Sequence, residues 1–172
     1  MRIYFGLLLL ISLQGSAQGK VVTTSNLKVT GEVKTTQVFS IYQLEQLSSI
    51  SIDSFVVYNH LMEKRGVIRN IEGVRVKEIL SQVEILSESP KKLSEYYFVF
   101  IASDNYSVVY SWNEIFNSPT GENIFIVTEK EGKKMQDQDD AISVLCTSDK
   151  ATGRRYVKGL QEISVRHIDQ AE

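Results

Sequence analysis

The residue types best suited to chemistry gather in one short stretch near the carboxyl end of the chain. Arg154, Arg155 and Lys158 follow a glycine in the sequence TGRRYVK. If residues 154–158 form a strand, Arg154 and Lys158 share one side, and Arg155 shares the other side with Val157. An inward-pointing Val157 would draw the Arg155 guanidinium towards the interior, where it needs an anion or other acceptors. Arginine can bind phosphate or carboxylate through two hydrogen bonds. Arg155 is therefore a candidate for binding an anionic cofactor, and the alternative is that it pairs with a structural carboxylate.

The other residue types used in catalysis or metal binding do not form a known set. His60 and His167 are the only histidines, and neither has a second histidine at metal-ligand spacing, so no zinc site is expected. Three aspartates in GKKMQDQDDA could offer oxygens to a hard cation. That stretch lacks the glycine and the distal glutamate of a calcium loop, so a solvated turn is expected. No nucleophile elbow, P-loop or dinucleotide fingerprint is present. We therefore assign no catalytic residues.

The single cysteine, Cys146, lies in the apolar run AISVLCT. A small buried side chain is the expected role for a cysteine in such a run. With one cysteine the chain has no internal disulfide and depends on its core for stability.

Alternating hydrophobicity predicts most of the elements that must position these residues. Strands are expected at 27–33, with Gly31 as a bulge or bend, and at 49–58. Two more are expected within 96–111, joined by a tight turn at Asp104-Asn105. Further short strands are expected in 123–135 and 141–167.

Helical spacing is confined to short segments. Ser40 and Gln43 form a capping box for a short helix in 39–49, and Ser111 and Glu114 form another for the turn at 112–116. Residues 72–83 give the clearest helix, and the polar segment 84–95 is expected to be a loop. Many strands with few crossover helices predict an α+β domain with mixed or antiparallel sheets, rather than a doubly wound parallel fold.

The amino-terminal residues 1–17 have the layout of a secretory signal peptide: Arg2, an apolar run, and small residues Gly15 and Ala17 before the expected cut. The apolar run is too short for a membrane span. Residues 18–172 are expected to form one domain. Without Arg2 the chain has 18 basic and 21 acidic side chains, a net charge of about −3. Nucleic-acid binding is therefore not expected, and the expected location is the periplasm or the exterior.

Several segments, in this order, resemble the sulfite-oxidase-like, molybdopterin-binding oxidoreductase domain. They are LKVTGEV, SIYQLEQL, IEGVRVKEIL, ASDNYSVVYSWNEI, GKKM and GRRYVKGLQEISV, and they extend from about Leu27 to Val165. The resemblance implies a compact α+β domain with mixed sheets. It also implies that Arg155 and Lys158 lie near the mouth where members of the family hold the phosphate of the cofactor.

The chain departs from that family at two places. Catalytic members bind molybdenum through a cysteine thiolate in a Cys-x-x-Asn segment after the second strand. Here Asn59 matches the asparagine, but Val56 takes the place of the cysteine and has no lone pair to donate. Exported members also carry a twin-arginine signal, whereas this chain has Arg2 alone. Both departures disfavour redox catalysis.

The sequence thus predicts an exported module with the sulfite-oxidase-type fold and no molybdenum site. It would bind a small anionic ligand or an envelope protein partner through a cleft near Arg155, Lys158 and Asn59, with no cofactor. The alternative is a molybdopterin-dependent oxidoreductase acting on a sulfite- or sulfoxide-like substrate. A third possibility is a structural domain that docks onto a membrane or a redox partner.

Overall fold

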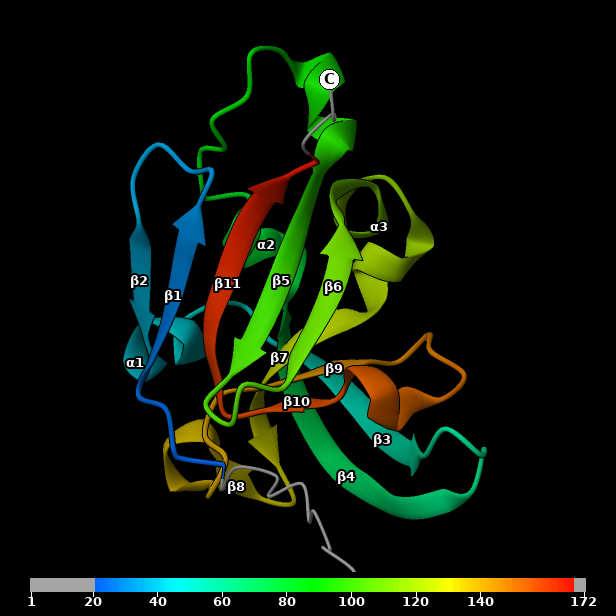
Figure 1. The fold of residues 1–172 in the computed structure, drawn as a ribbon. Helices are drawn as coiled ribbons and strands as arrows, with labels where there is room; N and C mark the ends of the chain where they lie inside the picture. Colours follow the sequence, from blue (N-terminus) through cyan, green and yellow to red (C-terminus); the bar gives the residue numbers. More distant parts are fainter. Residues whose placement is uncertain (1–20, 169–172) are drawn as a thin grey trace, which may run out of the picture.

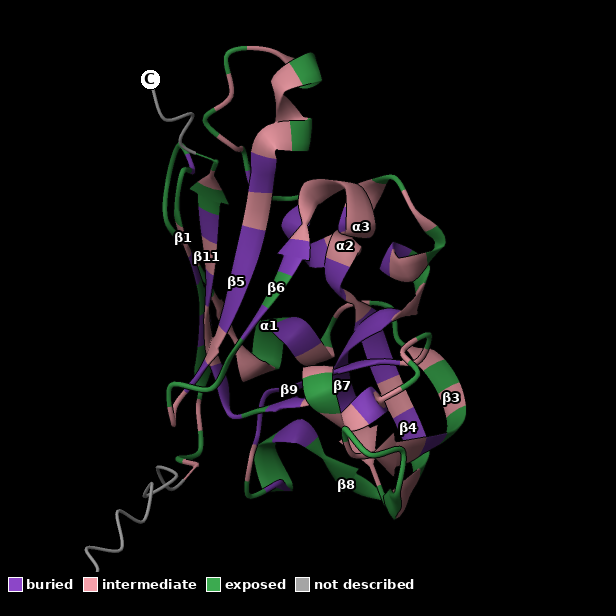
Figure 2. Cartoon of the chain, turned by 45° about the vertical axis from the view of Figure 1, so that its right-hand side comes forward, coloured by how far each residue is buried: buried purple, intermediate pink, exposed green. Residues whose placement is uncertain are grey.

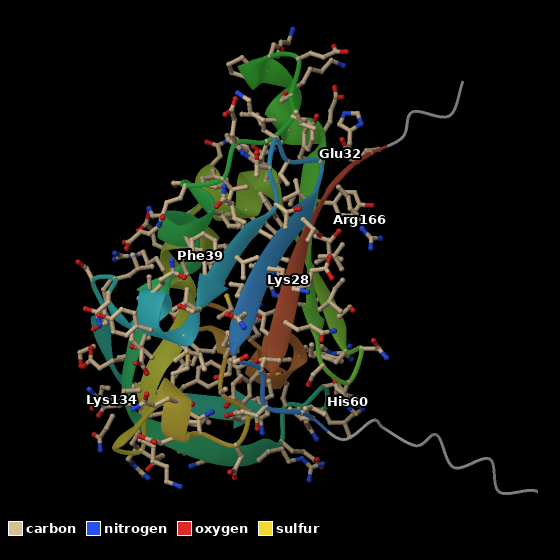
Figure 3. The ribbon with its side chains drawn as sticks, turned by 90° about the vertical axis from the view of Figure 1, so that its left-hand side faces the viewer. Lys28, Glu32, Phe39, His60, Lys134 and Arg166 are labelled. Carbon is tan, nitrogen blue, oxygen red and sulfur yellow. The ribbon has the colours of Figure 1, made fainter. Side chains whose placement is uncertain are left out.

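The computed structural model describes residues 21–168, and its first β-sheet has five strands in the order β2-β1-β11-β5-β6 (Figure 1). The strands are β1 (Asn26–Gly31), β2 (Gln37–Ser40), β5 (Tyr96–Ala102), β6 (Ser107–Ser111) and β11 (Leu160–His167). Only β1 and β11 are parallel. Leu27 and Val29 are buried while Lys28 between them is exposed, so the alternation in the sequence gives this sheet one buried face. Figure 3 views the molecule from the side of β2, with Lys28 of β1 and Arg166 of β11 labelled.

The second sheet is antiparallel and lies across the lower half of the molecule in Figure 1, in the order β10-β9-β7-β4-β3. Its strands are β3 (Ile50–Tyr58), β4 (Lys64–Arg75), β7 (Ile124–Lys130), β9 (Ser143–Cys146) and β10 (Val157–Lys158), and β8 (Lys133–Lys134) pairs with β7. β3 and β10 are the two edges of this sheet. The prediction of an α+β domain with mixed and antiparallel sheets is confirmed.

The helices are short. They are α1 (Ile41–Glu45), α2 (Val76–Leu80) and α3 (Trp112–Phe116), with 3-10 turns η1 (Pro90–Glu95), η2 (Pro119–Asn123), η3 (Met135–Asp137) and η4 (Thr152–Arg155). Both predicted capping boxes are present: the Ser40 hydroxyl accepts from the Gln43 N–H, and the Ser111 hydroxyl accepts from the Glu114 N–H. Within residues 21–168, no helix is long and apolar enough to cross a membrane.

Two predicted segments differ from the structure, and one predicted bend is present. The helix expected at 72–83 is only five residues long, because residues 72–75 continue β4 and pair with β7. The segment 84–95 is not a featureless loop, since Ile85 bridges to Val33 and η1 occupies its end. Gly31 ends β1 with φ +86°, and a Cβ there would lie 2.0 Å from the carbonyl oxygen of Val165, so the predicted bend requires glycine.

The core lies between the two sheets and extends to the far face of the second. The main cluster joins Phe100 of the first sheet to Ile126 of the second and to Ile79 of α2. On the far face a smaller cluster includes Phe55 and Phe125. β7 therefore contributes alternate side chains to both clusters, which explains why its first five residues are all buried (Figure 2).

A candidate anion-binding cleft at the end of strand β3

The candidate site begins with the turn η4, which packs on the carboxyl end of β3. Residues 154 and 155 belong to this 3-10 turn, so the predicted strand at 154–158 is wrong for both arginines. The Thr152 hydroxyl donates to the Val56 carbonyl oxygen at 2.5 Å and accepts from the Tyr58 N–H at 2.9 Å. A Cβ on Gly153 would lie 2.8 Å from the Tyr58 carbonyl oxygen, so the backbone of the turn touches the strand. In Figure 1 the orange turn lies against the tip of β3.

Arg155 is paired with structural carboxylates. Its Nε donates to Asp149 Oδ2 at 2.8 Å, its Nη2 donates to Asp149 Oδ1, and its Nη1 donates to Glu114 Oε1 at 3.0 Å. Its Cζ lies 4.3 Å from the centroid of the Tyr110 ring. The hydrogen bond with Asp149 is the main reason that the pKa of Arg155 is raised. Of the two interpretations of Arg155, these contacts favour the structural one.

Glu114 connects this arginine to the start of α3. Its Oε2 accepts from the Ser111 N–H at 2.8 Å in the capping box, while its Oε1 binds Arg155. Burial alone would raise the pKa of Glu114, but the hydrogen bonds from Ser111 and Arg155 outweigh burial and leave that pKa lowered. Arg155 therefore fixes η4 to the first turn of α3.

Cys146 is fully buried, as predicted, and its Sγ lies 3.3 Å from the Ser148 hydroxyl. Burial raises the pKa of the thiol. A buried, protonated thiol is a poor nucleophile and a poor metal ligand.

The structure does not bring Arg155, Lys158 and Asn59 together in one cavity. Lys158 is exposed, lies 5.1 Å from the Tyr156 ring centroid, and lines a cavity of about 460 Å³. Asn59 lines a different cavity of about 360 Å³, and Arg155 lines neither. In Figure 3, His60, which shares the cavity with Asn59, and Lys134 on β8 lie on opposite sides of this end of the molecule.

The cavity that contains Asn59 is a basic cleft, which we call the β3-end cleft. His60 comes from the β3–β4 connection, Arg65 from the start of β4, and Arg154 from η4. No carboxylate lines this cleft. Arg65 Nη2 contacts Glu63 Oε2 at 3.0 Å on the surface, whereas the Arg154 guanidinium has no hydrogen bond or ion pair with any residue from 21 to 168.

Two further residues give the cleft its shape. The Tyr106 hydroxyl, from the β5–β6 turn, donates to the Arg154 carbonyl oxygen. The Asn59 Oδ1 accepts from the Leu61 N–H at 3.0 Å and the Glu63 N–H at 2.9 Å. Asn59 thus organises the β3–β4 turn that leads to Arg65, and its own amide nitrogen donates to Glu63 Oε2.

Sequence reasoning missed Arg65, His60 and Tyr106 as members of one site. Arg65 could have been found, because a β3–β4 hairpin places it beside Asn59. Tyr106 and Arg154 meet only through the packing of two distant turns, which leaves no local signal.

The β3-end residues do not fit a thiolate-held molybdenum centre. Val56 offers no side-chain donor, and its carbonyl oxygen is already taken by Thr152. Across the described part of the chain, no three histidine, cysteine, aspartate or glutamate side chains group in a way that could hold a metal ion.

The comparisons with known proteins support a distant fold likeness. No family model matches the chain, and no curated protein matches. Among solved structures, the crystal structure of the sulfane dehydrogenase SoxCD from Paracoccus pantotrophus matches with a TM-score of 0.56 and 10% sequence identity. The match covers 81% of this chain but only 37% of that one, so this chain spans little more than a third of its length. The chain is therefore similar in fold, at a distance, to this sulfane dehydrogenase.

Proposed function

We propose that the chain is an exported, non-catalytic module that binds a small anion in the β3-end cleft. The observation that carries this proposal is the placement of two guanidinium groups, Arg65 and Arg154, at one cavity whose wall contains no carboxylate. Positive charge that lines a concave site attracts anions, and guanidinium groups bind carboxylates and phosphates in a bidentate manner.

Arg154 differs from its neighbour Arg155 in having no carboxylate partner among the described residues. Asp149 and Glu114 neutralise Arg155, while Arg154, one residue earlier, has no such partner in the described chain. A surface arginine held by its backbone beside a cavity is free to bind a ligand, since the Tyr106 hydroxyl and the Ala151 carbonyl oxygen fix the backbone of the turn.

The shape of the cleft restricts the class of ligand. A volume of about 360 Å³ suits a small molecule or the end of a larger one. Its wall includes Val57 and two tyrosines, Tyr58 and Tyr106, beside the cations. A carboxylate or phosphate group joined to a small apolar body matches this lining.

The proposed location is the periplasm or the exterior. Its support is the layout of residues 1–17, which lie outside the residues that the structure describes. A domain at 18–172 that is exported unfolded would reach that compartment without a cofactor loaded in the cytoplasm.

Calorimetric titration of the mature chain with inorganic phosphate and sulfate tests the proposal. Binding should weaken with added salt, because part of the attraction is electrostatic. Arg154→Gln should lower the affinity for phosphate about tenfold or more. Arg166→Gln, which alters an exposed arginine on β11, is the matched control and should bind as the wild type does. Equal phosphate binding by Arg154→Gln and the wild type would overturn the assignment of the cleft.

Metal and pterin analysis of protein purified from its native compartment tests the non-catalytic part of the proposal. Stoichiometric molybdenum and pterin would favour the oxidoreductase alternative instead.

A further inference from the structure

The edge of β3 that faces away from β4 carries unused backbone hydrogen-bonding groups. The Val56 carbonyl and the Tyr58 N–H point away from β4, because both bind Thr152. The register between β3 and β4 shows no shift from Ile50 to Val57. In an antiparallel pair, outward-pointing residues alternate with paired ones, so Ile50, Ile52 and Ser54 also point their N–H and C=O groups outward.

This edge lacks the protection that free strand edges usually have. Ser51, Asp53 and Ser54 are exposed, and none of the outward groups of Ile50, Ile52 or Ser54 has a partner within residues 21–168. Asp53 is the only charged residue in nine, and the strand contains no lysine or proline. Strands with such edges readily accept another strand.

The free edge ends at the β3-end cleft. Thr152 of η4 occupies the hydrogen-bonding positions of Val56 and Tyr58, so a strand added beside Ile50–Ser54 must stop where η4 begins. Gly153 and Arg154 of the same turn line the cleft. A peptide on this edge would therefore bring one of its ends to the cations of the cleft.

We propose that the natural ligand is an extended peptide that pairs with the Ile50–Ser54 edge of β3 and places a carboxylate in the β3-end cleft. This inference rests on the proposed anion-binding function and specifies its ligand. The backbone pairing would supply affinity, and Arg65 and Arg154 would select for the negative end. A five- to six-residue peptide, about 17–20 Å long when extended, is sufficient for this pairing.

The carboxylate could come from the chain terminus or from an Asp or Glu side chain. Three fluorescent six-residue peptides of one β-prone sequence separate these sources. One has a free carboxyl terminus, one is amidated with a terminal Asp, and one is amidated and neutral. Fluorescence anisotropy with the mature chain should show binding of at least one acidic peptide, about tenfold or more tighter than the neutral one. Equal affinity for all three, or binding of neither acidic peptide, would overturn the proposal.

Ser54→Pro tests the strand pairing, because it removes an outward N–H without removing a bond to β4. It should lower peptide affinity about tenfold while phosphate binding stays as in the wild type, and Ser54→Ala should keep both. Unchanged peptide affinity in Ser54→Pro would refute pairing at this edge. N-methylation of alternate peptide residues gives the same test without altering the protein: one methylation register should abolish binding. If the wild type does not bind phosphate at all, the proposed anion site is refuted instead.

Discussion

Replacement of Arg155 by methionine separates the structural role assigned to this residue from a role in ligand binding. The change removes three hydrogen bonds to two carboxylates and a cation from the face of Tyr110. It leaves the Asp149 side chain, which is only 14% exposed, without its counter-charge. Loss of one partner of a buried pair costs about 3–5 kcal/mol, and the guanidinium here is 24% exposed, so the low end applies. We expect the free energy of unfolding to fall by about 3 kcal/mol.

Thermal unfolding followed by circular dichroism measures this effect. For a domain of this size, about 3 kcal/mol lowers the melting temperature by about 6–12 °C. Arg154→Met is the matched control, because Arg154 is exposed and makes no side-chain ion pair with residues 21–168. It should change stability by less than about 0.5 kcal/mol while weakening phosphate binding. Arg154→Met should therefore lose binding with little loss of stability, whereas Arg155→Met should lose stability.

A double-mutant cycle adds a second check. Glu114→Gln and Arg155→Met should be non-additive, with a coupling energy of about 1 kcal/mol, because their side chains are in contact. The structural argument would be refuted if Arg155→Met melts like the wild type and fails to bind phosphate. That result would indicate that Arg155 binds the ligand, as the sequence suggested.

Three further predictions concern Glu114, Gly31 and Cys146. The pKa of Glu114 is lowered in the folded state, so the stability that its carboxylate contributes is complete above the ordinary glutamate pKa of about 4.5 and is lost as the pH falls below that value. The acid-induced drop in melting temperature should therefore be smaller in Glu114→Gln than in the wild type. Gly31→Ala should lower the free energy of unfolding in urea by more than about 2 kcal/mol, whereas Gly132→Ala, with φ +74° but open space, should cost about 1 kcal/mol; similar costs would contradict the close contact at Gly31. Cys146 should react with a thiol reagent only after unfolding, and rapid labelling of the native protein would show that the thiol is accessible.

The elements of this fold were largely predictable because their signals are local. The alternation of Leu27, Lys28 and Val29 gave a half-buried strand, and the pairs Ser40–Gln43 and Ser111–Glu114 gave two helix starts. Such patterns depend on neighbours within one turn or two residues, and they hold in any tertiary context that buries the apolar face.

The helix α2 shows where local periodicity fails. The spacing across residues 72–83 suits a helix, yet residues 72–75 pair with β7 instead. Backbone pairing with a distant strand outweighed the intrinsic preference of four residues, and the pairing also places Val74 in the core. Nothing within the segment encodes the presence of β7.

The candidate site shows a further dependence on tertiary structure, since one turn reversed the roles of two adjacent arginines. A strand would have directed Arg155 inward towards a ligand and left Arg154 on the surface. In the 3-10 turn, Arg155 is indeed drawn inward, but Asp149, six residues earlier, and Glu114 on α3 are there to meet it. The ion pairs of Arg155 with Asp149 and Glu114 hold the turn in place, and this gives Arg154 a defined position beside Arg65. Without those carboxylates, the positive charges of Arg154 and Arg155 would repel each other and lower the stability of the fold. The Arg155 cluster, one guanidinium held between two carboxylates, thus fixes the turn that presents Arg154. Anion binding at the β3-end cleft should therefore weaken when Asp149 is replaced by asparagine, although Asp149 lies outside the cleft.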